Sequence, residues 1–146
     1  MKIDIVANSI PRKLKGLRNA GKDVLFEVIE ELTLKTHRQA VTSIQRGPAS
    51  GRVYRKSNPR RTHQASAPGE YPMSDTGRLA ASIRFETPKN KTKPEGVVGT
   101  NLRYGKYLEL RPSSMGGRPW LLPAFSEATE NAEAILARAM KRRVKK

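Results

Sequence analysis

The chain has 146 residues, with 29 Lys or Arg against 13 Asp or Glu, and its formal net charge of +16 attracts nucleic acid or acidic protein. This length fits one domain over residues 1–146, and a hydrophobic share of 36% predicts a modest core that gains from a partner. The absence of cysteine excludes disulfides and cysteine-ligated zinc, and the sequence shows no signal-peptide pattern and no membrane span. We therefore expect no association with a membrane. We expect a protein that stays in a cytoplasm or is packed into a particle assembled there.

The first third of the chain predicts a short strand and then a long helix. Residues 2–7 alternate polar and apolar side chains, as a strand does. Ser9 offers an N-cap and Pro11 suits the first helical turn, although Gly21 weakens this start and allows a later one. Gly47 and the proline after it end the helix. The apolar residues at helical spacing are Leu14, Leu17, Val24, Val28, Leu32, Val41 and Ile44.

Residues 47–75 are expected to form an extended basic arm or loop within the domain. They carry five basic and two acidic side chains, and residues 52–55 alternate as a short strand would. Residues 57–73 hold three prolines and no apolar period, which predicts a loop or extended arm rather than a core element. Asp75 is placed to cap a helix that runs to Ile83.

The remaining residues predict a hairpin, a short helix and a C-terminal helix. The C-terminal helix begins at Pro123, and its early glutamates and late arginines suit the helix macrodipole. The elements before it are a strand at 84–86, a charged turn at 87–96, a returning strand at 97–100, a short helix around 104–108 and a flexible loop at 112–117. The fold class is therefore α+β: a long N-terminal helix, a small antiparallel sheet, a C-terminal helix packed on it, and an extended Pro/Gly-rich arm.

No group of residues predicts catalysis or cofactor binding. The triplet at residues 75–77 is that of aspartic proteases, but a polar segment precedes it, Arg78 follows it, and helix capping explains Asp75 without chemistry. His63, Glu70 and Asp75 lie at irregular spacing on a flexible stretch, which is a poor metal site. We expect no enzyme, no metal and no cofactor.

Two features favour binding to a macromolecule. The basic run from Arg52 to Arg61 includes Tyr54, which is able to stack on a base, so a basic nucleic-acid-binding protein is one alternative, although no known recognition motif is present. Pro68 and the glycine after it form a turn that holds the arm in few conformations, which lowers the entropy cost of docking. Trp120 is expected in the core, with a share in an intersubunit contact left open.

Three segments carry a resemblance to a known family. Residues 50–83 read SGRVYRKSNPRRTHQASAPGEYPMSDTGRLAASI, residues 104–109 read YGKYLE, and residues 118–125 read RPWLLPAF. In this order they resemble the head–tail joining, or neck and tail-completion, proteins of tailed bacteriophages, over about residues 10–140. The family places a glycine soon after the glutamate of the second segment, whereas here the glycines come at 116–117.

The resemblance implies a structural subunit of the virion neck, assembled in the host bacterial cytoplasm. It implies a homo-oligomeric ring, expected to be a hexamer, between the head connector or stopper and the tail tube or terminator, around the DNA channel and with non-specific contact with the genome. A morphogenesis factor that leaves the finished particle is a further alternative. The residues expected to contact a neighbouring subunit or partner are Arg52, Tyr54, Arg55, Arg60, Arg61, His63, Pro68, Tyr71 and Trp120.

Overall fold

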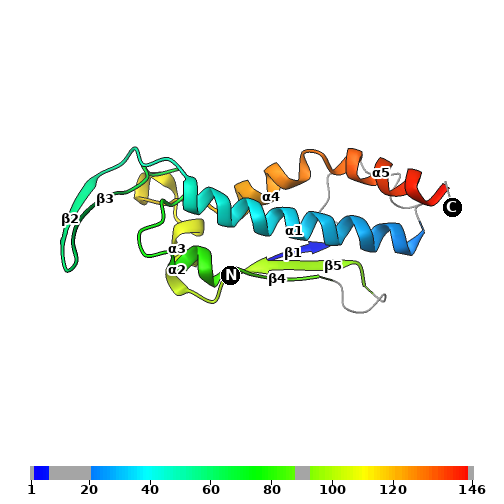
Figure 1. Ribbon diagram of the computed structural model, residues 1–146, viewed down its shortest axis with the longest axis horizontal. Helices are drawn as coiled ribbons and strands as arrows, with labels where there is room; N and C mark the ends of the chain where they lie inside the picture. The colour runs from blue at the N-terminus through cyan, green and yellow to red at the C-terminus, as the bar shows by residue number, and fades with distance from the viewer. Residues whose placement is uncertain (1, 7–20, 88–92, 145–146) are drawn as a thin grey trace.

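A single long helix forms the axis of the molecule. The computed structural model describes residues 2–6, 21–87 and 93–144, and helix α1 runs along its body, with the β2–β3 ribbon beyond one end (Figure 1). The elements in chain order are β1 (Lys2–Val6), α1 (Lys22–Arg46), β2 (Val53–Ser57), β3 (Arg60–Gln64), α2 (Arg78–Ser82), β4 (Arg84–Glu86), β5 (Glu95–Gly99), α3 (Arg103–Leu110), the 3-10 helix η3 (Ser113–Met115), α4 (Leu121–Thr129) and α5 (Ala132–Val144).

Helix α1 lies between two layers. A three-stranded antiparallel sheet of order β1-β5-β4 covers one side, and α4 and α5 cover the other (Figure 1). A second sheet contains only β2 and β3, which form a curved ribbon beyond the end of the body (Figure 1). The α+β class, the long N-terminal helix and the small antiparallel sheet are therefore confirmed.

The core forms where the apolar stripe of α1 meets both layers. The fully or nearly fully buried residues are Val24, Val28, Ile29, Leu32, Ala40 and Ile44 on α1, with Leu79, Ile83, Val98, Trp120, Leu121, Ala124, Ile135, Leu136 and Ala139 from the other elements. Thr33 on α1 is buried as well, and its hydroxyl donates to the carbonyl of Ile29 at 2.7 Å. A Cβ at Gly96 of β5 would lie 1.8 Å from the Thr33 hydroxyl oxygen, so glycine permits this close approach of sheet and helix.

Three sequence-based expectations need correction. The C-terminal helices pack on α1 rather than on the sheet, because α1 occupies the space between them (Figure 1). Two helices, α4 and α5, stand where a single C-terminal helix was expected, and residues 130–131 separate them. The Thr129 hydroxyl donates to the carbonyls of Phe125 and Ser126 at this end, a pattern that bends helices. The expected flexible loop at 112–117 contains the 3-10 helix η3.

Other expectations are confirmed or lie outside the described residues. The strands at β1, β4 and β5 and the short helix α3 were expected from the sequence. Helix α1 begins at Lys22, after Gly21, which agrees with the later start. The proposed N-terminal helix signals at Ser9 and Pro11, and the apolar positions Leu14 and Leu17, lie outside the described residues, as do residues 88–92 of the charged turn. The last two residues of that turn, 95–96, belong to β5 instead.

One carboxylate joins the second and third family-like segments. Glu109, at the end of α3, accepts hydrogen bonds from the backbone N–H groups of Trp120 (2.6 Å), Leu121 (2.8 Å) and Leu122 (2.9 Å). These N–H groups open α4 and have no partner within the helix. The Trp120 side chain is buried, and its Nε1 donates to the carbonyl of Gly105 at 2.9 Å. The core role expected for Trp120 is confirmed.

Candidate partner-binding site

The ribbon of β2 and β3, residues Val53–Gln64 (hereafter the hairpin), is the candidate site. Its antiparallel register pairs Tyr54 with His63 and Lys56 with Arg61. Residues 57–73 were expected to form a loop or extended arm, so the β3 strand at Arg60–Gln64 is a correction. Strand β3 alternates less clearly than β2 in the sequence, and pairing with β2 supplies the regular structure.

The pairing gives the hairpin two faces of different character. Paired residues in an antiparallel ribbon share a face, and neighbours along a strand alternate. The inward face, which points at the body, carries Tyr54, Lys56, Arg61 and His63. The outward face carries Val53, Arg55, Ser57, Arg60, Thr62 and Gln64. All residues of the outward face are exposed, whereas Lys56 and His63 are half-buried.

Asp75 ties the inward face to the body. Its carboxylate pairs with Lys56 and lies 2.6 Å from Arg61 Nη2 and 3.8 Å from His63 Nδ1. The hydrogen bond from Lys56, together with the positive charge of Arg61, holds the pKa of the Asp75 carboxyl below its usual value. Asp75 was expected to cap α2, but the N-cap of that helix is Gly77, at φ 75°, and no side chain caps it. The carboxylate faces cations of the hairpin instead.

The segment after the hairpin is fixed to the body rather than extended. The ladder continues past the strands, since the N–H of Gly51 donates to the carbonyl of Ala65 at 2.7 Å. Ser66 is buried, and its carbonyl accepts two hydrogen bonds from the Arg118 guanidinium, at 2.9 and 3.2 Å. The N–H of Gly69 donates to the carbonyl of Gly117 at 2.8 Å. The expected arm at 47–75 is therefore a projecting hairpin on a fixed base.

The Glu70 carboxylate links the segments before and after the hairpin. Its carboxylate accepts hydrogen bonds from the Ser50 hydroxyl at 2.7 Å and from the N–H of Ala67 at 2.8 Å. The Ser50 hydrogen bond is the main reason that the pKa of the Glu70 carboxyl is lowered, and the Ala67 N–H adds to it. Both groups favour the ionised form.

The nine expected contact residues do not form one surface: some lie on the hairpin, and others lie on its base or in the body. The Arg52 guanidinium lies over the Tyr54 ring, 5.5 Å from its centroid, at the start of the hairpin. Arg55 and Arg60 are on the outward face, whereas Arg61 and His63 are turned to Asp75. The remaining three, Pro68, Tyr71 and Trp120, belong to the base or the body.

Of those three, only Pro68 is exposed. The Tyr71 hydroxyl donates to Glu127 Oε1 on α4 at 2.8 Å, and burial raises the pKa of this phenol, with the Glu127 hydrogen bond adding to the effect. Trp120 has no exposed surface, which leaves no side-chain area for the intersubunit contact that was left open. Sequence reasoning missed Asp75, Glu109 and Arg118 as structural partners, because their partners are more than ten residues away along the chain.

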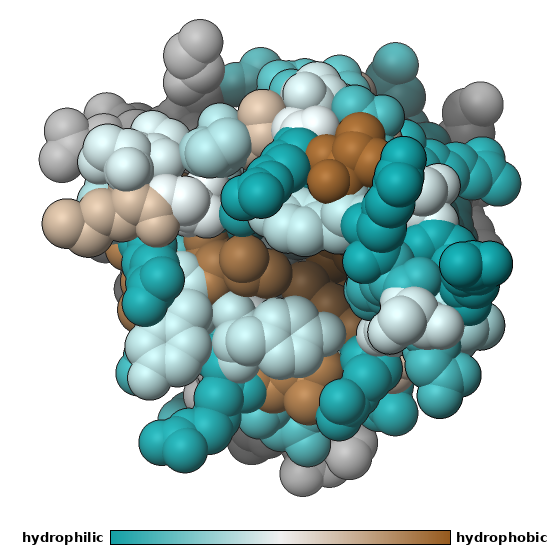
Figure 2. Space-filling model, turned by 90° about the vertical axis from the view of Figure 1, so that its left-hand side faces the viewer, coloured by the Kyte–Doolittle hydropathy of each residue, from teal (hydrophilic) through white to brown (hydrophobic). Residues whose placement is uncertain are grey.

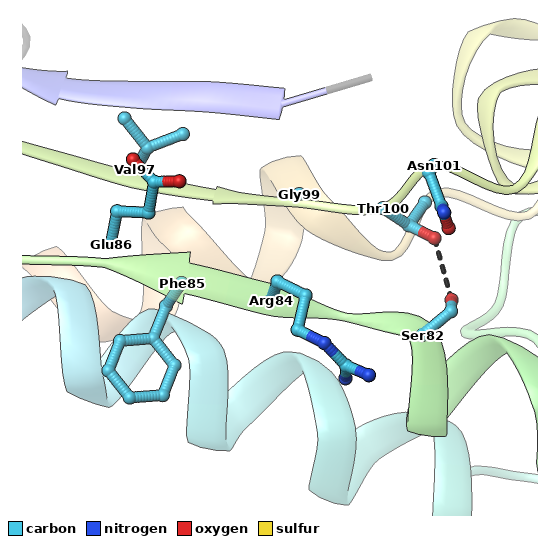
Figure 3. A pocket seen from close by; sticks show the side chains of 8 residues that line it. All are labelled: Ser82, Arg84, Phe85, Glu86, Val97, Gly99, Thr100 and Asn101. Atoms are coloured by element: carbon cyan, nitrogen blue, oxygen red, sulfur yellow. Dashed lines mark hydrogen bonds between the residues drawn. The ribbon is translucent and has the colours of Figure 1, made fainter.

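An open groove of about 440 Å³ lies beside β4 and β5 (Figure 3). At one end the hydroxyls of Ser82 and Thr100 hydrogen-bond each other at 2.6 Å. Phe85 lies over α1, where its ring centroid is 4.7 Å from that of His37. The groove offers one carboxylate, that of Glu86, and the described residues contain no cluster of His, Asp or Glu suited to a metal ion.

Comparison of the chain with protein-family models, with curated proteins and with solved structures finds no match. Among the described residues, no helix combines the length and the apolar character that crossing a membrane requires.

Proposed function

We propose that the chain is a structural subunit of the neck of a tailed bacteriophage. In this proposal it forms a homo-oligomeric ring, expected to be a hexamer, that joins the head connector or stopper to the tail tube or terminator. The ring surrounds the channel for the genome in the virion. Its subunits are made in the host bacterial cytoplasm and need no cofactor.

The projecting hairpin is the observation that supports this proposal best. The first family-like segment contains the hairpin and Asp75, which ties it to the body. The second contains Glu109, and the third contains Arg118 and the start of α4, which support the base. The segments that carry the resemblance thus build one unit, whose purpose is to present a ribbon beyond the body (Figure 1).

A held ribbon suits assembly for physical reasons. A two-stranded ribbon is at best marginally stable alone, and Asp75 keeps this one in a defined position before any partner arrives. Prior ordering lowers the entropy cost of docking. Contact between a projection on one subunit and a different surface on the next is heterologous, and such contacts close into rings when the rotation permits.

The same end of the molecule exposes apolar side chains. Seen from the hairpin end, the surface has a hollow lined by apolar atoms among polar ones (Figure 2). Exposed large apolar residues lie on α3, on η3 and at the start of α4: Tyr104, Tyr107, Leu110, Met115 and Leu122. In the proposed ring, a neighbouring subunit covers this surface, because exposed apolar side chains favour protein contact.

The test replaces residues 53–64 by a two-residue turn in the phage that encodes the chain. Arg52 and Ala65 are already hydrogen-bonded across the ribbon at 3.0 Å, so a tight turn is able to join them. We expect a subunit with an unchanged thermal midpoint, because the hairpin lies outside the core, and virions that stop as separate heads and tails. Electron microscopy of the particles and a melting curve of the purified variant measure the two results.

Infectious tailed particles made with this variant would contradict the proposal. Mass spectrometry of purified wild-type virions separates the neck subunit from a morphogenesis factor, since only the former stays in the finished particle. Light scattering of the purified chain gives the mass of any ring that forms without partners.

A further inference from the structure

The outward face of the hairpin carries positive charge that no described residue neutralises. Arg55 and Arg60 are exposed, and no ion-pair partner is found for them in the described part of the chain. Lys56 and Arg61, on the other face of the same strands, both pair with Asp75. Among the described residues, Asp75 thus offsets part of the charge on that face, and no carboxylate pairs with the arginines of the outward face.

This face offers several hydrogen-bond donors and no carboxylate. Beside the two guanidinium groups lie the hydroxyls of Ser57 and Thr62, and residues 51–64 contain no Asp or Glu. Arg55 and Arg60 are diagonal neighbours across the ribbon, a position at which Cα atoms lie about 7 Å apart. A ligand that fits must offer several negatively charged acceptors at short intervals.

Phosphates of a nucleic acid duplex meet this requirement better than a protein surface. Protein interfaces centre on apolar and aromatic side chains, whereas Val53 is the only apolar residue of the outward face. Interfaces with DNA are polar and strongly basic, and Arg, Ser and Thr are common donors to phosphate oxygens. The major groove of B-DNA is about 12 Å wide, and this width admits a two-stranded ribbon.

We propose that the outward face of the hairpin binds the phosphate backbone of duplex DNA, with Arg55 and Arg60 as its charged contacts. The contact is independent of sequence, because it reads no base edge. This inference rests on the proposed function, in which the genome that passes through the ring supplies the duplex. It assigns Arg55 and Arg60 of the outward face to the channel side of the ring.

The test measures binding of the purified full-length chain to a short duplex of mixed sequence by fluorescence anisotropy, over a series of NaCl concentrations. The variant Arg55→Gln/Arg60→Gln is expected to lower the slope of log affinity against log salt by about 1.8, two phosphate contacts at about 0.9 each. Its affinity at low salt is expected to fall at least about tenfold. Both side chains are exposed, so the variant should fold as the wild type does.

The matched control is Arg138→Gln/Arg142→Gln, which removes the same charge from α5, at the opposite end of the molecule (Figure 1). Its slope is expected to stay close to that of the wild type. Equal losses in the two variants would show attraction by net charge alone and overturn the proposal. Absence of duplex binding by the wild type at low salt would also overturn it.

A third arm replaces the duplex by polyglutamate at equal charge concentration. Tighter binding of polyglutamate, lost in Arg55→Gln/Arg60→Gln, would assign the face to an acidic protein and overturn the proposal. Light scattering of the same samples without DNA reports ring formation. A ring that ignores the duplex contradicts only this inference, and a duplex-binding monomer whose hairpin is dispensable for tail joining contradicts only the neck assignment.

Discussion

At the scale of single residues, Glu109 shows how one side chain connects distant segments. Its two carboxylate oxygens accept three N–H groups at the start of α4, eleven to thirteen residues away. A negative charge at this position also favours the N-terminal end of the helix dipole. The start of α4 lacks a Ser, Thr, Asp or Asn cap, since Trp120 stands at that position, so Glu109 takes over the capping role.

We predict that Glu109→Ala lowers the free energy of unfolding by about 2 kcal/mol, since it leaves helix N–H groups without their acceptor. Glu109→Gln should cost less, because its amide keeps one acceptor oxygen. Urea denaturation followed by circular dichroism measures both. Glu30→Gln, a neutralisation of an exposed glutamate on α1, serves as control and should change the free energy by less than about 0.5 kcal/mol. A loss for Glu109→Ala no larger than that of the control would show that the cap is dispensable.

His37 predicts a pH dependence of stability. Partial burial lowers the pKa of its imidazole, and the charge of Arg84 adds to this, against a hydrogen bond to the backbone of Ile83. Because the pKa is lower in the folded chain than in the unfolded one, the unfolded chain takes up the proton first. The His37 contribution is therefore complete above the unfolded value of 6.5 and is lost as the pH falls through the lowered folded value.

We expect His37→Gln to have a flatter stability profile than the wild type between neutral and mildly acid pH. Urea midpoints measured at several pH values give the comparison. Parallel profiles for wild type and His37→Gln would refute the assignment.

At the scale of elements, the hairpin depends on a single carboxylate for its position. Lys56 of β2 and Arg61 and His63 of β3 all converge on Asp75. Ion pairs at a partly exposed site contribute little to global stability. Their effect here is to restrict where the ribbon points, and that is a local property.

We predict that Asp75→Asn leaves the thermal midpoint nearly unchanged but speeds hydrogen exchange at the amides of β2 and β3. Since the pKa of Asp75 is lowered by its cations, the carboxylate keeps the hairpin in place above the ordinary value of 3.8. The difference from wild type should vanish as the pH falls through the lowered pKa. Exchange measured by mass spectrometry on hairpin peptides tests this, with Glu86→Gln on β4 as the matched neutralisation. Equal protection of the hairpin in both variants would argue against the role of Asp75.

At the scale of the whole molecule, charge and packing are unevenly distributed. Near the C-terminus, α5 places Arg138, Arg142 and Arg143 against acidic residues of α1, namely Glu31, Glu27 and Asp23. This part of the basic tail therefore meets local counter-charges, whereas the outward face of the hairpin has none among the described residues. The end of the molecule that carries the hairpin also exposes apolar side chains (Figure 2).

Much of the local structure was predictable from this sequence. The apolar spacing of Val24, Val28 and Leu32 predicted the face that α1 buries, since a helix repeats every 3.6 residues whatever it packs against. Alternation and turn residues likewise predicted β4 and β5. The α+β class followed from these elements. The sequence pattern also located the basic run that holds the candidate site.

The sequence alone thus determined the strongly periodic elements, such as α1 and its apolar face, because a repeat of 3.6 residues depends on neighbours a few positions away. Only the tertiary structure decided that Asp75 faces the hairpin instead of capping α2, and that Trp120 lies wholly inside the body. It also decided which arginines are neutralised and which are free. These outcomes depend on contacts between segments far apart in the chain, and their geometry is set by the packing of the whole molecule rather than by any local pattern.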